Sequence, residues 1–188
     1  MSKSLKSLLI VGGIVVVIIF LLGGSYNGLV RSEEEVTAKF ADISVQLERR
    51  ADLIPNLVNS VKGYMQHEKD VIDSIASARQ QLVNAGTVEE KASANSELTS
   101  ALNRLLVVVE NYPELKANTN FIQLQDELAG TENRISVSRS DYNNAVKSYN
   151  QTIKTFPKNI LARMFGFEEK QYFEAKASST EVPNVSFE

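Results

Sequence analysis

Few residues in this chain have the type and spacing that chemistry requires. The sequence contains no cysteine, which excludes disulfides, thiolate metal sites and a cysteine nucleophile. Its single histidine, His67, has no second histidine four residues away, so the spacing of a helical zinc site is missing. Serine, threonine and lysine side chains lack a general base at a recognisable spacing. We therefore predict no enzymatic activity, no cofactor, and no catalytic or metal-binding residue.

A group of charged residues lies within or beside the apolar stripes of the expected helices. These residues are Arg50, Arg79, Glu110, Glu132 and Arg139. One interpretation is a buried polar layer in which charge-assisted pairs fix the register of the helices. The other is a ligand or relay site inside the domain. We favour the structural interpretation, because charges inside proteins are usually paired.

Two Tyr-Asn pairs, at residues 142–143 and 149–150, repeat at an interval of seven residues. This interval places both tyrosines on one face of a helix, next to Val146 and Ile153. We interpret them as packing residues with hydroxyl and amide groups in a polar seam, and not as a ladder for stacking a ligand.

The elements that carry these residues are predicted from hydrophobic periodicity. Apolar residues recur at steps of three and four from Val36 to Leu82, a pattern typical of a helix packed on one face. Pro55 lies inside this stripe without changing its phase, and a proline removes the backbone hydrogen bond to the carbonyl four residues earlier, that of Ala51. We predict a continuous helix kinked at Pro55; a turn with a new helix from Asp52 is the alternative.

Two more long helices follow. Thr87 and Glu90 have the spacing of a capping box, which predicts a helix that ends before Pro113. Asn118 begins the cap of a third helix that stops before Pro157. No run of strand-like alternation interrupts these patterns. The predicted fold is therefore all-α, an antiparallel helical bundle with coiled-coil-like packing.

Residues 7–30 carry no charged side chain. As a helix, these 24 residues would span about 36 Å, more than the roughly 30 Å hydrocarbon core of a bilayer. We predict a single-pass transmembrane anchor at residues 7–30, preceded by a short basic N-terminus at 1–6. A cleaved signal peptide is the alternative, and it is disfavoured because the helical pattern begins directly after Tyr26. The bundle would occupy residues 31–174, and an extended or flexible tail residues 175–188.

Several segments occur in the order and spacing of a known family. They are YNGLV at 26–30, RADLIPNLV at 50–58, ENYPELKAN at 110–118 and FPKNILARMFGF at 156–167. On these motifs the sequence resembles the LemA family over residues 26–187. The resemblance implies an N-terminal transmembrane helix, a four-helix bundle and no established reaction. It also implies a cytoplasmic bundle, whereas Lys3 and Lys6 before the anchor slightly favour an outer or periplasmic one.

The predicted function follows from these features. A net charge of −3 makes nucleic acid a poor partner. We predict a membrane-anchored scaffold or interaction protein of the bacterial cell envelope, which forms homo-oligomers and binds membrane or envelope proteins that the sequence does not identify. The alternative is a membrane-tethered sensor or enzyme with a small-molecule site in the polar layer of the bundle.

Overall fold

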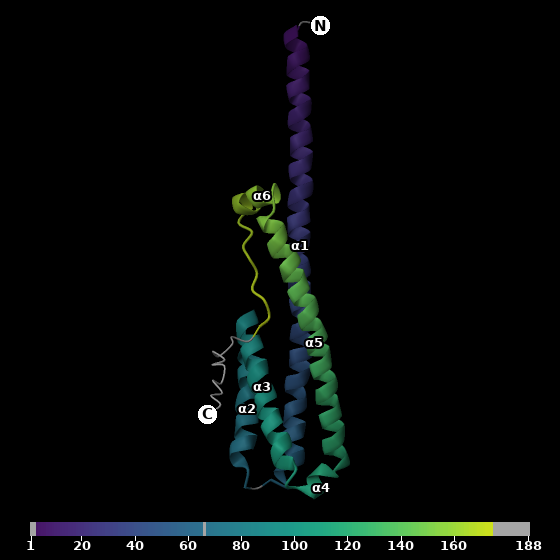
Figure 1. Cartoon of the computed structure of the whole chain (residues 1–188), viewed down its shortest axis with the longest axis vertical. Coiled ribbons are helices and arrows are strands. Elements are labelled where there is room, and N and C mark those ends of the chain that lie inside the picture. The colour runs from purple at the N-terminus through teal and green to yellow at the C-terminus, as the bar shows by residue number, and fades with distance from the viewer. Residues whose placement is uncertain (1–2, 66, 175–188) are drawn as a thin grey trace, which may run out of the picture. The chain divides into compact units, whose positions relative to one another are not determined.

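The structure, a computed structural model, describes residues 3–65 and 67–174. Every regular element in these residues is a helix. In chain order they are α1 (Lys3–Lys62), α2 (Lys69–Asn84), α3 (Val88–Val109), α4 (Pro113–Lys116), α5 (Thr119–Lys154) and α6 (Lys158–Phe165) (Figure 1). The all-α prediction is confirmed. The predicted tail, residues 175–188, lies outside the described residues.

The chain divides into two compact units. Among the described residues, the first unit combines residues 3–42 with residues 138–171, and the second combines residues 43–65 and 67–137 with residues 172–174. The long helices α1 and α5 contribute to both units. The boundary of the predicted bundle at residue 31 and its antiparallel four-helix arrangement remain predictions.

Helix α1 joins the apolar segment to the packed stripe without a break. It runs for 60 residues and includes Pro55, so the alternative of a separate helix beginning at Asp52 is wrong. The predicted kink remains a prediction. By length and composition, α1 is also the one helix of the described chain that could cross a membrane, although a cleaved signal sequence would meet the same criterion.

The chain reverses between the end of α1 at Lys62 and the start of α2 at Lys69 (Figure 1), so the prediction that the first helix continues to Leu82 is wrong. Gly63, a poor helix former, directly follows α1. Met65 lies in the connection but is buried, four residues after the buried Val61. The apolar stripe therefore passes through a real turn with its phase intact, which explains why periodicity did not reveal the reversal.

The predicted helix boundaries further along the chain are confirmed by their caps. At the start of α3, the Thr87 hydroxyl accepts a hydrogen bond from the Glu90 N–H, and the Glu90 carboxylate accepts one from the Thr87 N–H, completing the capping box. Pro113 is the first residue of α4, where its missing N–H costs nothing. The Asn118 side chain caps α5 by accepting hydrogen bonds from the N–H groups of residues 120 and 121.

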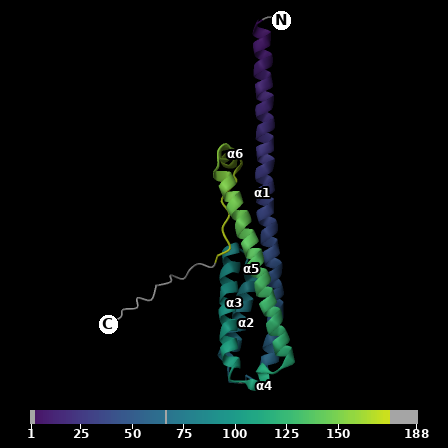
Figure 2. The same ribbon diagram turned by 45° about the vertical axis from the view of Figure 1, so that its right-hand side comes forward.

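The second unit has a continuous apolar core. Helices α2 and α3 lie side by side in both Figure 1 and Figure 2. The buried side chains come from α1, α2, α3 and α5, and those of α1 and α2 lie in the predicted apolar stripe from Val36 to Leu82. They include Ile43, Leu47, Ile54, Leu57, Ile75, Leu82, Leu98, Leu105, Phe121, Leu128 and Ile135.

The first unit packs residues 26–40 of α1 against the end of α5 and against α6. The rings of Phe40 and Tyr142 lie 5.8 Å apart, between centroids. Figure 1 shows α6 beside α1, and Figure 2 shows the same neighbours. The buried residues of this unit include Leu29, Val36, Tyr142, Val146, Tyr149, Ile153 and Leu161.

Helix α6 was not predicted from the sequence, because eight residues are too few to show helical periodicity. It ends at Gly166, whose φ of 76° places it in the left-handed region that glycine adopts without strain. The N–H of Phe167 then donates to the carbonyl of Ala162, 2.9 Å away. This cap turns the chain back along α5.

Candidate functional site

Arg50 is the centre of a polar cluster in the second unit. It projects from α1 and is only 3% exposed. Its Nη1 donates a hydrogen bond to Oδ1 of Asn95 on α3, 2.6 Å away. The same nitrogen lies 2.5 Å from Oε2 of Glu132 on α5, in an ion pair without the alignment of a hydrogen bond. One guanidinium thus contacts polar groups from two other helices.

The electrostatics of this cluster are set by burial. Removal from water lowers the pKa of Arg50, and the carboxylate of Glu132 works in the opposite direction. The side chain of Glu132 is 42% exposed, so water shares in stabilising the pair. Nε of Arg50 is buried and has no hydrogen-bond partner in the described chain. The cluster is therefore paired in charge but keeps one donor unused.

Arg79 lies at a separate place in the same unit. Its Nε donates to the carbonyl of Ala51, 2.8 Å away, and so connects α2 to α1. That carbonyl is the one that Pro55 leaves without its usual helical donor. Arg79 therefore satisfies a backbone acceptor that the proline has released, a role the sequence interpretation did not foresee.

The other two members of the predicted layer are not buried, and the prediction was wrong for them. Glu110 is the C-cap residue of α3, where the helical phase ends, and its carboxylate pairs with Lys116 instead, at 2.6 Å. Arg139 is exposed on α5. The structure thus brings Arg50 and Glu132 together, adds Asn95, and leaves Glu110 and Arg139 at the surface.

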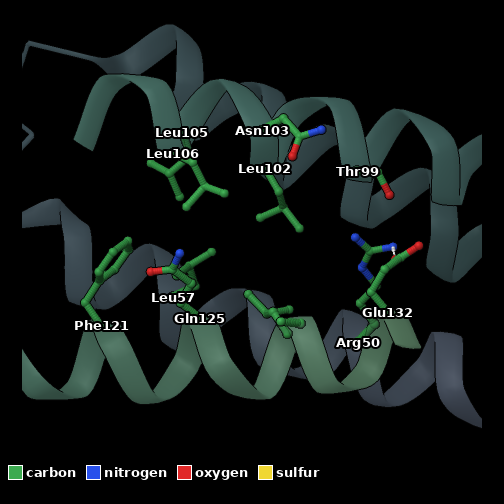
Figure 3. Close-up of a pocket in the computed structure, with 12 residues that line it drawn as sticks. Arg50, Leu57, Thr99, Leu102, Asn103, Leu105, Leu106, Phe121, Gln125 and Glu132 are labelled. Atoms are coloured by element: carbon green, nitrogen blue, oxygen red, sulfur yellow. Dashed lines mark ion pairs between the residues drawn. The ribbon is translucent and has the colours of Figure 1, made fainter. Parts of the chain in front are cut away.

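A cavity of about 210 Å³ adjoins the polar cluster (Figure 3). Leucines of α3 form one wall, and Phe121 and Gln125 of α5 form the other, while Arg50 and Glu132 lie at one end. The lining residues are Arg50, Leu57, Thr99, Leu102, Asn103, Leu105, Leu106, Phe121, Gln125, Leu128, Ala129 and Glu132. Several of them are exposed, so the cavity opens to solvent.

The polar groups of this cavity can hold a ligand by charge and by hydrogen bonds. These groups are an arginine, a carboxylate, amides and a hydroxyl, without a histidine or a lysine. His67 is exposed in the connection between α1 and α2. Among residues 12–65 and 67–174, at least, no three His, Cys, Asp or Glu side chains are grouped so that they could hold a metal ion.

The Tyr-Asn repeat of α5 organises the first unit. The hydroxyl of Tyr142 donates to the carbonyl of Gln171, 2.8 Å away. Asn150 exchanges two hydrogen bonds of 2.9 Å with the backbone of Lys170. These bonds fasten the segment after α6 along α5.

Tyr149 is the exception in this seam. Its hydroxyl is buried without a hydrogen-bond partner in the described chain. Burial raises the pKa of Tyr149 to about 12, and the carboxylates of Glu33 and Glu168 add to that effect. The phenol is therefore neutral at physiological pH. Its ring faces the Lys170 ammonium at 5.8 Å, an arrangement typical of a packing residue with a cation over its face.

Comparison with known proteins finds similar sequences among proteins named MamQ and LemA. Magnetosome protein MamQ 2 of Paramagnetospirillum magneticum is 29% identical, with 80% of this chain and 65% of the relative covered. Magnetosome protein MamQ of Magnetospirillum gryphiswaldense is 26% identical with the same coverage. Protein LemA of Metamycoplasma hominis is 26% identical, with 83% of this chain and 72% of the relative covered. The chain thus spans less than two thirds of the length of these MamQ proteins.

The family model of the LemA family matches residues 39–187. The match includes the polar cluster, the cavity, the Tyr-Asn seam and α6. Since it extends over most of the sequence, this chain belongs to the LemA family.

Proposed function

We propose that the protein is a membrane-anchored helical scaffold of the bacterial cell envelope that associates with itself and with membrane proteins, and has no catalysis of its own. The observation that carries the proposal is the continuity of α1. One helix contains both the apolar residues 7–30 and the stripe that packs into the folded units. The folded domain would therefore be joined to the membrane anchor by a continuous helix, without a flexible linker.

The surface of the second unit supports an interaction role. Large apolar side chains are exposed on α1, α2, α3 and α5, and the most exposed is Val107, at 72%. They are Val45, Val83, Leu106, Val107, Ile122 and Val137. Confinement to a membrane raises the effective concentration of such domains, which favours lateral assembly even when each contact is weak. The names of the relatives denote no reaction, in keeping with a binding protein.

The proposal is tested on the full chain, extracted in mild detergent from its native membrane. We expect a protein mass above the 20.8 kDa of one chain in light scattering, with partner proteins identified after mild cross-linking. As a variant, Val107→Ser removes the most exposed apolar side chain of the unit and should shift the distribution toward the monomer. The matched control is Ser136→Ala, which alters another exposed position of the same unit. A monomer at all concentrations, with no cross-linked partner, would contradict the proposal.

A second function is favoured by one observation, the cavity that has Arg50 and Glu132 at one end. A small molecule with an apolar body and one acceptor would fit those walls. Cyclohexanone is a soluble probe of this kind. Saturation-transfer NMR on the full chain in nanodiscs should then show binding, and Ala129→Phe, which fills the cavity from an exposed position, should abolish it. Equal signals from both proteins would exclude this site.

A further inference from the structure

Helix α6 has apolar side chains on both of its faces. Leu161 and Ala162 are buried in the first unit. On the other side, Ile160 and Met164 lie one turn apart and are 57% and 63% exposed. Phe156, just before the helix, is 75% exposed. A helix at the surface of a soluble domain normally presents polar side chains on its outer face, so this apolar face requires a partner.

The position of α6 along α1 identifies the partner. The ring of Tyr26 lies 4.8 Å from the ring of Phe165 and 5.9 Å from that of Phe167, between centroids. Tyr26 precedes the end of the uncharged segment, at Val30, by four residues, or about 6 Å along a helix. The uncharged segment exceeds the hydrocarbon core by a similar length. Tyr26 therefore belongs at the level of the lipid head groups, where aromatic side chains concentrate.

The exposed apolar surface of α1 continues toward α6. Leucines 21 and 22 and Phe20 are exposed on α1, and Phe20 reaches 77%. Beyond them come Tyr26 and the exposed Phe165 of α6. A bilayer that covers the apolar part of α1 would thus meet the outer face of α6 at its margin.

The charges on α6 suit an anionic lipid surface. Lys158 and Arg163 form no ion pair within the described residues, whereas Glu33 and Glu169 are paired with Lys170 and Lys154 at 2.6 and 2.7 Å. Glu168 is one exposed carboxylate that opposes this effect. Basic residues beside exposed apolar ones are typical of helices that lie in the membrane interface.

We propose that α6 is an interfacial helix, which inserts Ile160 and Met164 into the surface of the same bilayer that α1 spans and presents Lys158 and Arg163 to lipid phosphates. This inference rests on the proposed membrane anchor. It adds a second contact with lipid, which would restrict the tilt of the first unit on the membrane.

The test uses the natural absence of cysteine. Single cysteines at Ile160 and at Met164 are labelled with a fluorophore in the full chain. The protein is reconstituted in phosphatidylcholine vesicles containing phosphatidylglycerol and spin-labelled lipids. Phe20→Cys reports on the anchor, and Val107→Cys, an exposed site in the second unit, is the control. We expect shallow spin labels to quench the fluorophore at both α6 positions, deep ones to quench it at residue 20, and neither to quench it at residue 107.

The outcomes separate the two proposals. Quenching at residue 20 with none at residues 160 and 164 would overturn the interfacial helix and leave the anchor in place. An apolar emission spectrum at residue 160 without quenching would also overturn it, because a protein partner would then cover α6. No quenching at residue 20 would remove the anchor itself. Lys158→Glu with Arg163→Glu should reduce quenching at residue 160 only in vesicles with the anionic lipid.

Discussion

Arg50 shows how one buried side chain can hold three helices in register. Its guanidinium contacts Asn95 on α3 and Glu132 on α5 while its backbone belongs to α1. Burial lowers its pKa, but an arginine retains its proton at physiological pH, so the domain must supply the opposing charge. The residue therefore specifies which faces of the helices can meet.

We expect Arg50→Ala to destabilise the folded protein. Breaking a buried ion pair costs about 3–5 kcal/mol and an exposed one about 0–1 kcal/mol. Because Glu132 is partly exposed, we expect an intermediate loss of about 2 kcal/mol in the free energy of unfolding. Thermal and urea unfolding in one detergent would measure it. Arg139→Ala, at an exposed position, is the control and should change stability by less than about 0.5 kcal/mol. Similar losses in both variants would contradict a structural role of Arg50.

At the scale of the element, Pro55 of α1 and Arg79 of α2 act together at the interface of the two helices. The proline leaves the Ala51 carbonyl without a helical donor, and Arg79 of α2 donates to it across the interface. A potential defect in α1 thereby becomes a point of attachment for α2. This explains how a helix can continue through a proline without an unsatisfied carbonyl at its packed face.

This arrangement predicts that the effects of Pro55 and Arg79 on the free energy of unfolding are coupled. In the natural chain, Arg79→Ala should cost about 1–2 kcal/mol, because a charge-assisted hydrogen bond to a part-buried carbonyl is lost. In a Pro55→Ala background, the new N–H of residue 55 can bond Ala51, so the same change should cost about 0.5 kcal/mol or less. A double-mutant cycle by urea unfolding measures the difference. Equal costs in the two backgrounds would show that Arg79 acts independently of the proline.

The capping box of α3 predicts a dependence on pH. Hydrogen bonds from Thr87 and Gly86 hold the pKa of Glu90 below its ordinary value of 4.5. A carboxylate with a lowered pKa stabilises the fold above that ordinary value, and the contribution disappears as pH falls through the lowered one. The difference in melting temperature between the natural chain and Glu90→Ala should therefore be largest near neutral pH and shrink below about pH 4.5. A constant difference between pH 7 and pH 3 would contradict this assignment.

Periodicity and caps identified the elements that are long or capped, and failed where local signals were weak. The sequence correctly predicted the apolar stripe of α1, the capping box at Thr87 and the end of α5. The turn after Lys62 was not, because Met65 keeps the spacing of the core inside the connection. Arg50 was recognised because a charge interrupts an apolar stripe. Its partner Asn95 and the cavity depend on how the helices pack together, which one sequence does not encode locally.

At the scale of the whole molecule, the apolar residues 7–30 and the folded units share the helix α1. A sequence cleaved after residue 25 would shorten α1 and remove the apolar surface that continues toward α6. We therefore expect the protein to retain its first 30 residues and to stay in the membrane pellet after an alkaline carbonate wash. Mass spectrometry of the purified protein checks the first point. A soluble protein that begins near Tyr26 would show that residues 7–30 are a signal peptide.

The side of the membrane that the folded units occupy is a separate prediction. Lys3 and Lys6 precede the apolar segment, and Arg31 and Lys39 follow it, so the positive charges favour an outer or periplasmic location only slightly. On that basis, a Val107→Cys variant should react with a membrane-impermeant maleimide in cells whose inner membrane is intact and directly accessible to the reagent. The same variant in lysed cells gives the full extent of labelling, and the cysteine-free natural chain gives the background. Because residue 107 is exposed on α3, a lack of labelling before lysis cannot be attributed to burial within the chain. Labelling only after lysis would place the second unit in the cytoplasm, as the family resemblance implies, and would mean that the basic N-terminus does not determine the orientation of α1.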